Sequence, residues 1–187
     1  MIGNDVVDLK EAKLTSNWQR PRFLDKLFTT NEQRIIKNSD HSFLMVWRLW
    51  SMKEASYKLY TQLYPSRFYA PNAFQCDIEN SKVSYKDFQC FVKTEITAEH
   101  MLSEACLKEQ KMTSKLLYFN YSDTQKQSKV LKAKIIKSIS ETYQVPRDQL
   151  RFYKNEFGTP MVKFNSEYIH VSLSHHGNYG VFAISHL

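Results

Sequence analysis

The clearest pattern of hydrophobic and polar positions in the chain is helical and extends from about Ser42 to Tyr60. Its apolar side chains recur at the i, i+3, i+4, i+7 spacing of one helical face: Phe43, Val46, Trp47 and Trp50. Residues 126–143 carry a second helical stripe, with lysines on the opposite face. Shorter helices are predicted over 8–12, over 23–28, and from Thr29 or Thr30 through Ile36. One long helix is therefore expected in each half of the chain.

Strand patterns accompany both long helices. Alternation of apolar and polar residues predicts strands over 2–9, 74–78, 88–96, 116–121, 150–154, 161–164, 169–173 and 179–185, with residues 80–87 as the connection of a hairpin. The composition becomes polar and charged around 108–114, which predicts a boundary between residues 1–110 and residues 115–187. We expect an α+β fold of two similar halves in one compact unit, each a long helix packed on a small, mainly antiparallel sheet.

Length and composition are typical of a globular protein in a reducing compartment. The 187 residues are 42% hydrophobic, which is enough for a core without metal or disulfide staples. Cys76, Cys90 and Cys106 are too widely spaced for a metal or redox motif, and we interpret them as buried thiols. The N-terminus lacks the pattern of a signal peptide, and no run of eighteen apolar residues occurs. We expect a cytoplasmic protein with no membrane partner.

The net charge indicates an anionic partner without naming it. Lys and Arg number 26 against 19 Asp and Glu, a formal charge of +7. An excess of this size suits nucleic acid, an anionic lipid surface, a phosphorylated ligand or an acidic protein, and it also serves solubility alone. The basic residues are dispersed and no recognised nucleic-acid motif is present, so we expect no nucleic-acid partner.

Glu54 and Lys58 continue the helical face that begins with Trp47 and Trp50, at spacings of three, four and four residues. A charge at the rim of an apolar face is partly desolvated, which favours metal coordination or a perturbed pKa. The alternative is an ordinary i,i+4 ion pair on the helix surface.

Acidic residues near the N-terminus are candidates for a metal site. Asp5 and Asp8 lie on the first predicted strand, and a carboxylate at its end could meet Glu54. Mg²⁺ is typically held by one or two carboxylates together with substrate phosphates and waters. The alternative is that Asp5 and Asp8 cap the following helix.

A polar strand near the C-terminus is the third candidate. Alternation places Ser172 and Ser174 on one face of a strand that leads into His175 and His176. Hydroxyl and imidazole donors there could bind a pyrophosphate. Zinc is disfavoured, because adjacent histidines on a strand point to opposite faces and no second ligand motif exists.

Several separated segments together resemble the 4′-phosphopantetheinyl transferase superfamily. Residues 50–58, Trp-Ser-Met-Lys-Glu-Ala-Ser-Tyr-Lys, match its W-[ST]-x-K-E-[AS]-x-x-K motif at every specified position. Residues 3–8 are similar to its G-x-D motif, and residues 22–32 resemble its R-F-x-x-x-x-F-[ST]-x-x-E stretch. Residues 171–175 are similar to its S-[IL]-S-H strand.

The order of these motifs is that of the holo-acyl-carrier-protein synthase type, which assembles as trimers. Residues 130–173, however, resemble the N-terminal half of the surfactin-activating type, which has two halves in one chain. This resemblance leads to the hypothesis that the chain is a circular permutation of the two-halved type. A monomer is then expected rather than a trimer, with residues 1–110 as the metal-and-base half and residues 115–187 as the coenzyme A half.

The resemblance implies a reaction and its principal residues. It implies Mg²⁺-dependent transfer of 4′-phosphopantetheine from coenzyme A to a serine of an acyl- or peptidyl-carrier protein, as in fatty acid or polyketide biosynthesis, with release of 3′,5′-ADP. It implies that Asp5 and Glu54 bind Mg²⁺, with Asp8 as a further candidate ligand. Glu54 would help to deprotonate the carrier serine, and Lys58 would stabilise the leaving group.

The resemblance also implies a set of coenzyme contacts. Lys58, Ser174 and His175 would hold the pyrophosphate, and Arg48 and Lys53 are further candidates for coenzyme binding.

Two positions depart from the family pattern. Val7 stands where the two-halved type has a second acidic residue, and Thr159 stands where it has a lysine near the nucleotide. Candidate replacements for that lysine are Lys129, Lys132 and Arg151. Two alternatives stay open: a non-catalytic family member that binds coenzyme A or carrier protein, and a basic nucleic-acid-binding module.

Overall fold

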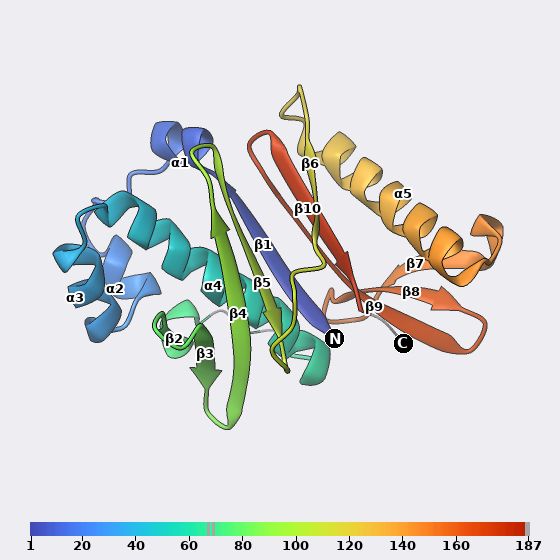
Figure 1. The fold of residues 1–187 in the computed structure, drawn as a ribbon, viewed down its shortest axis with the longest axis horizontal. Coiled ribbons are helices and arrows are strands. Elements are labelled where there is room, and N and C mark those ends of the chain that lie inside the picture. The colour runs from blue at the N-terminus through green and yellow to red at the C-terminus, as the bar shows by residue number, and fades with distance from the viewer. Residues whose placement is uncertain (67, 69, 186–187) are drawn as a thin grey trace.

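Two five-stranded antiparallel sheets with the same strand order form the protein (Figure 1). The computed structural model describes residues 1–66, 68 and 70–185. The first sheet has the order β1-β5-β4-β3-β2 and consists of β1 (Ile2–Asp8), β2 (Gln75–Asp77), β3 (Lys82–Tyr85), β4 (Phe88–Ile96) and β5 (His100–Cys106). The second has the order β6-β10-β9-β8-β7 and consists of β6 (Lys115–Tyr118), β7 (Leu150–Lys154), β8 (Pro160–Phe164), β9 (Glu167–His176) and β10 (Tyr179–Ile184).

Each sheet is covered by one long helix, α4 (Ser42–Leu63) on the first and α5 (Thr124–Tyr143) on the second (Figure 1). Each half therefore begins with a strand, passes through a helix and returns through four strands, the last of which pairs with the first. The predicted α+β fold class is confirmed. The shorter helices are α1 (Leu9–Thr15), α2 (Phe23–Leu27), α3 (Thr30–Asn38) and the 3₁₀ turns η1 (Pro71–Ala73) and η2 (Arg147–Gln149).

The sequence pattern does not predict β3 or β5. β5 pairs with β1 on one side and with β4 on the other, and all its residues from Met101 to Cys106 are buried. A strand buried on both faces has no apolar–polar alternation to reveal it. β3 has only four residues and lies within residues 80–87, so that the predicted hairpin is in fact a three-stranded meander.

Gly3 allows β1 to pass directly against α4. A Cβ at this position would overlap the carbonyl oxygen of Ala55 and lie 2.7 Å from the amide nitrogen of Leu59. Only glycine permits this close approach of strand and helix backbones. Asp5 follows two residues later on β1, and its carbonyl accepts a 3.5 Å hydrogen bond from Ser51 of α4. The glycine thus helps to place the carboxylate of Asp5 next to the helix.

The two halves meet where β1 lies beside β9 and β10. The hydroxyl of Ser172 accepts from the amide of Asn4 at 2.9 Å and donates to the side-chain oxygen of Asn4 at 2.8 Å. Gln62 of α4 donates to the carbonyl of Ile2 at 2.8 Å and to that of Val171 at 3.2 Å. These buried contacts join segments from both ends of the chain. A small apolar cluster adds to the junction: Val6, Leu102, Tyr179 and Val181.

No helix within residues 1–66, 68 and 70–185 combines the length and apolar character needed to cross a bilayer.

Candidate active site

A cavity of about 550 Å³ opens where α4, β1 and the end of β9 come together. Four residues of the helical face predicted on α4 line it: Trp47, Trp50, Glu54 and Lys58. β1 contributes Asp5 to the wall, and β9 contributes Ser174 and His175. Helical spacing, strand alternation and the junction of the two halves therefore bring the predicted carboxylates, ammonium, hydroxyl and imidazole around one space.

Asp5 is the centre of the polar contacts in this cavity. Its Oδ1 lies 3.1 Å from the ammonium of Lys58 and accepts a 2.8 Å hydrogen bond from the hydroxyl of Ser174. Lys58 also donates to the carbonyl of Asn4 at 2.8 Å. In the part of the chain that the structure describes, no donor contacts the other carboxylate oxygen of Asp5. Lys58 is thus held by β1 and does not form the simple surface pair with Glu54 that the helical spacing allows.

Glu54 has a strongly perturbed acidity. Burial, and to a smaller extent the negative charge of Asp5, raise its pKa from 4.5 to about 7, although the positive charge of Lys58 partly offsets the rise. Asp5 and Lys58 are the charged groups that act on Glu54, while Arg20, Arg22 and Lys26 line the cavity as exposed side chains. A pKa near neutrality suits a general base, and a pair of neighbouring carboxylates suits a cation.

Asp5 and Glu54 fit Mg²⁺ as its protein ligands. Carboxylate oxygens are the donors that Mg²⁺ prefers, and Mg²⁺ usually keeps several waters or substrate oxygens in addition. Among the residues described, no cluster of three or more His, Cys, Asp or Glu side chains is arranged to hold a metal. Asp5 and Glu54 would therefore supply part of the coordination shell of a Mg²⁺ ion.

Asp8 does not belong to this donor set, contrary to the sequence-based prediction. Its side chain does not line the cavity, and both of its oxygens are engaged elsewhere. Oδ1 caps α1 by accepting from the amide of Glu11 at 3.0 Å, and Oδ2 accepts from the amide of Asn178 at 2.9 Å. For Asp8, the helix-capping alternative is the correct one.

His175 is half-buried and lines the cavity beside Lys58. Burial lowers its pKa, and the nearby charges of Lys58 and His176 lower it further. Its imidazole is therefore neutral at pH 7 and can donate one hydrogen bond. His176 also lines the cavity, and its Nδ1 accepts from the amide of Asp8 at 3.0 Å.

The structure does not support Arg48 and Lys53 as coenzyme contacts. Lys53 is 1% exposed, and its ammonium lies 2.8 Å from the carboxylate of Glu32. Lys53 also donates to the carbonyls of Pro71 and Phe74, so it is enclosed in the first half. Arg48 is half-buried and does not line the cavity. Arg48 follows Trp47 and Lys53 precedes Glu54, and adjacent residues of an α-helix are about 100° apart around its axis. Arg48 and Lys53 therefore point away from the cavity that Trp47 and Glu54 line.

A second cavity, of about 400 Å³, adjoins the first and shares Lys58, Ser174 and His175 with it. It extends toward the β7–β8 hairpin, where Lys154 and the segment 158–160 line it.

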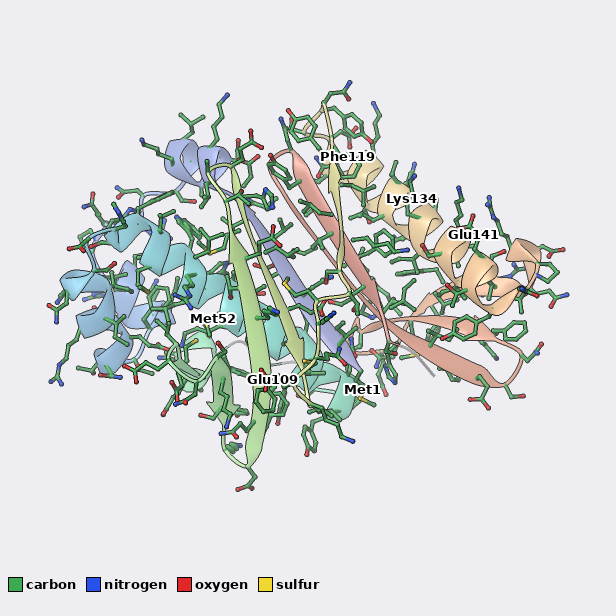
Figure 2. The ribbon with its side chains drawn as sticks, in the orientation of Figure 1. Met1, Met52, Glu109, Phe119, Lys134 and Glu141 are labelled. Atoms are coloured by element: carbon green, nitrogen blue, oxygen red, sulfur yellow. The ribbon has the colours of Figure 1, made fainter. Side chains whose placement is uncertain are left out.

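The three basic residues predicted to replace a lysine at position 159 do not line this second cavity. Lys132 lies over the ring of Phe152 at 5.4 Å, and Arg151 donates to the carbonyl of Leu150 at 3.3 Å. Lys129 is exposed on α5, like Lys134, which points from the helix into solvent (Figure 2).

No role in the cavity was assigned from the sequence to a group of basic residues near the N-terminus. Arg20, Arg22 and Lys26 are exposed at the edge of the first cavity. Arg22 and Lys26 belong to the R-F stretch and Arg20 precedes it by two residues, so this cluster of basic residues is a signal from which the sequence could have predicted them. Trp47 is 7% exposed, and its indole N–H has no hydrogen-bond partner in the described residues. A buried donor without an acceptor in a cavity wall is a natural contact for a ligand.

The fold and the site define a two-halved α+β protein with a charged cleft between its halves. Comparison with protein families identifies residues 1–111 as a match to the 4′-phosphopantetheinyl transferase superfamily. The chain belongs to this superfamily, and the predicted resemblance is confirmed. Comparison with curated proteins gives no match.

Proposed function

We propose that the protein transfers 4′-phosphopantetheine from coenzyme A to a serine of an acyl- or peptidyl-carrier protein and releases 3′,5′-ADP. It would be a cytoplasmic, Mg²⁺-dependent enzyme of the holo-acyl-carrier-protein synthase type. The observation that carries the proposal is the convergence of Asp5, Glu54, Lys58, Ser174 and His175 on one cavity. Membership of the superfamily supports the same reaction.

The two cavities suggest which part of coenzyme A each of them holds. In phosphoryl transfer the attacking and leaving oxygens lie roughly in line on opposite sides of the phosphorus. Of the two cavities, Glu54 lines only the first, whereas Lys58, Ser174 and His175 line both. The serine and the pantetheine arm would therefore occupy the first cavity. The diphosphate would lie at the shared residues, and 3′,5′-ADP would leave through the second cavity.

The proposed step needs a base and a cation. Glu54, with a pKa of about 7, accepts the proton of the carrier serine directly or through a water. The serine oxygen forms a bond to the phosphorus attached to pantetheine, and the bridging P–O bond of the diphosphate breaks. The electron pair of that bond remains on the phosphate of 3′,5′-ADP, where the ammonium of Lys58 stabilises the new charge. No covalent enzyme intermediate is required.

Asp5 and Glu54 are the residues that would hold Mg²⁺. Bound there, the ion would screen the negative charge of the diphosphate. Ser174 and Lys58 already fix Oδ1 of Asp5, which orients its carboxylate toward the cavity before a ligand arrives.

The surface around the first cavity supports a protein acceptor. Arg20, Arg22 and Lys26 are exposed at its edge, and the chain carries a net charge of +7. Carrier proteins are usually acidic, so this surface would steer them toward the cavity.

Intact mass spectrometry of apo-carrier proteins tests the proposal. A panel of carriers is incubated with the protein, coenzyme A and Mg²⁺, and parallel samples contain EDTA. The proposal predicts a gain of one phosphopantetheine mass on at least one carrier, which EDTA abolishes. No gain on any carrier, together with no binding of coenzyme A, would contradict it and favour a non-catalytic protein.

A further inference from the structure

Among the residues that the structure describes, Lys154 is the basic residue that lines the second cavity but not the first. Among the described residues that line this cavity, only Lys58 and Lys154 are Lys or Arg, and Lys58 belongs to both cavities. Lys154 is exposed and lines the wall of the second cavity. Its charge is therefore available to an anionic ligand.

The β7–β8 hairpin fixes the position of this lysine. Lys154 is the last residue of β7 and lies opposite Pro160 in the antiparallel register. The side chain of Asn155 closes the turn by accepting from the amides of Phe157 at 3.0 Å and Thr159 at 2.9 Å. Opposed residues on paired strands have Cβ atoms roughly 5 Å apart, so the side chain of Lys154 rises beside the segment 158–160.

Thr159 offers no charge at this place. It is 5% exposed, and its hydroxyl donates to the carbonyl of Thr61 at 3.4 Å, so it is turned into the protein. The positive charge on this side of the cavity is therefore that of Lys154, at the end of the paired strand β7.

The chemistry of the leaving nucleotide supplies a matching anion. In 3′,5′-ADP the 5′-phosphate comes from the diphosphate, and the 3′-phosphate projects from the other side of the ribose. With the diphosphate at Lys58, Ser174 and His175, as proposed above, the 3′-phosphate would lie further into the second cavity. We propose that Lys154 binds the 3′-phosphate and makes the protein selective for coenzyme A over 3′-dephospho-coenzyme A. This inference rests on the proposed function, which places the nucleotide in this cavity.

Calorimetric titration without turnover tests the inference. The wild type and the variants Lys154→Gln and Lys154→Arg are titrated with 3′,5′-ADP and with 5′-AMP, which lacks the 3′-phosphate. Lys163→Gln is the matched control, because Lys163 is an exposed lysine of the same hairpin that lies over Tyr168 and lines neither cavity.

We expect Lys154→Gln to weaken binding of 3′,5′-ADP by about tenfold, since a charge-assisted hydrogen bond is lost. Its affinity for 5′-AMP should change by less than about twofold, and Lys154→Arg should retain most of the affinity for 3′,5′-ADP. Equal losses for 3′,5′-ADP and 5′-AMP, equal losses in Lys154→Gln and Lys163→Gln, or no binding of 3′,5′-ADP by the wild type would overturn the inference.

The same variants separate this inference from the proposed function. A Lys154-dependent preference for 3′,5′-ADP without modification of any carrier would refute the transfer reaction and leave the nucleotide assignment standing. Transfer with unchanged nucleotide preference in Lys154→Gln would refute the role of Lys154 alone.

Discussion

Glu54 is held in surroundings that oppose its negative charge. Burial and the carboxylate of Asp5 raise its pKa to about 7, although Lys58 lies on the same face of α4. Such an arrangement costs stability and is typical of functional sites. The periodicity of α4 is sufficient to predict Glu54 and Lys58 as cavity residues. It could not predict the acidity of Glu54, which depends on Asp5, about fifty residues earlier in the chain.

Replacement of Glu54 by Gln should stabilise the metal-free protein in a pH-dependent way. Between pH 4.5 and 7 the unfolded carboxylate is ionised while the folded one is protonated, so the folded state binds more protons. The wild type therefore loses stability relative to Glu54→Gln as the pH rises through this window. We expect a difference of about 2 kcal/mol at pH 8, allowing for partial exposure of Glu54, and almost none at pH 4.

Urea denaturation of both proteins in EDTA at pH 4, 6 and 8 measures this difference. A constant gap between the two unfolding free energies would show that Glu54 has an ordinary pKa in the folded protein.

The motif on α4 contains residues from two sides of the helix, and the sequence does not separate their roles. Lys53 and Glu54 are adjacent in the motif, but Lys53 points into the first half and pairs with Glu32 at 2.8 Å. Glu32 also forms the capping box of α3 with Thr29 and accepts from the amide of Cys76 at 2.9 Å. The pair thus connects α3, α4 and the start of β2.

Prediction of Thr29 or Thr30 as the cap of α3 depended on local sequence alone, whereas the Lys53–Glu32 pair depends on the packing of separate elements.

Replacement of Lys53 by Ala should destabilise the protein by about 3–5 kcal/mol, because the carboxylate of Glu32 would remain buried without its partner. The double variant Lys53→Met/Glu32→Gln should recover a large part of this loss, since both charges are removed. Chemical denaturation measures stability, and titration with 3′,5′-ADP measures binding. A folded double variant with unchanged nucleotide affinity is the expected result. A specific loss of nucleotide binding in a stable double variant would restore Lys53 as a coenzyme contact.

At the scale of the whole molecule, the candidate site is assembled from both ends of one chain. Asp5 of the first half accepts from Ser174 of the second at 2.8 Å, and Asn4 and Ser172 join the same strands. Sequence patterns predicted two similar halves and the α+β class, because each half has its own helix and strands. They could not reveal the side-by-side arrangement of β1 and β9, which depends on contacts between residues almost 170 positions apart.

The hypothesis of a permuted two-halved protein predicts a monomer, because the candidate site then lies between two halves of one chain. Light scattering coupled to size-exclusion chromatography should give a mass near 22.1 kDa over a range of protein concentrations. A mass of three chains, with residues of neighbouring subunits required at each site, would contradict the hypothesis of a permuted two-halved protein.

The central claim is that the cavity between the halves transfers phosphopantetheine with Glu54 as its base. The most direct measurement is the initial rate of modification of a responsive apo-carrier by the wild type and by Glu54→Gln, followed by intact mass, with Trp18→Phe as a control outside this cavity. We predict that Glu54→Gln lowers the rate by at least about 100-fold, while the rate of Trp18→Phe stays within about threefold of the wild type. A rate for Glu54→Gln within a few-fold of the wild type would contradict the claim.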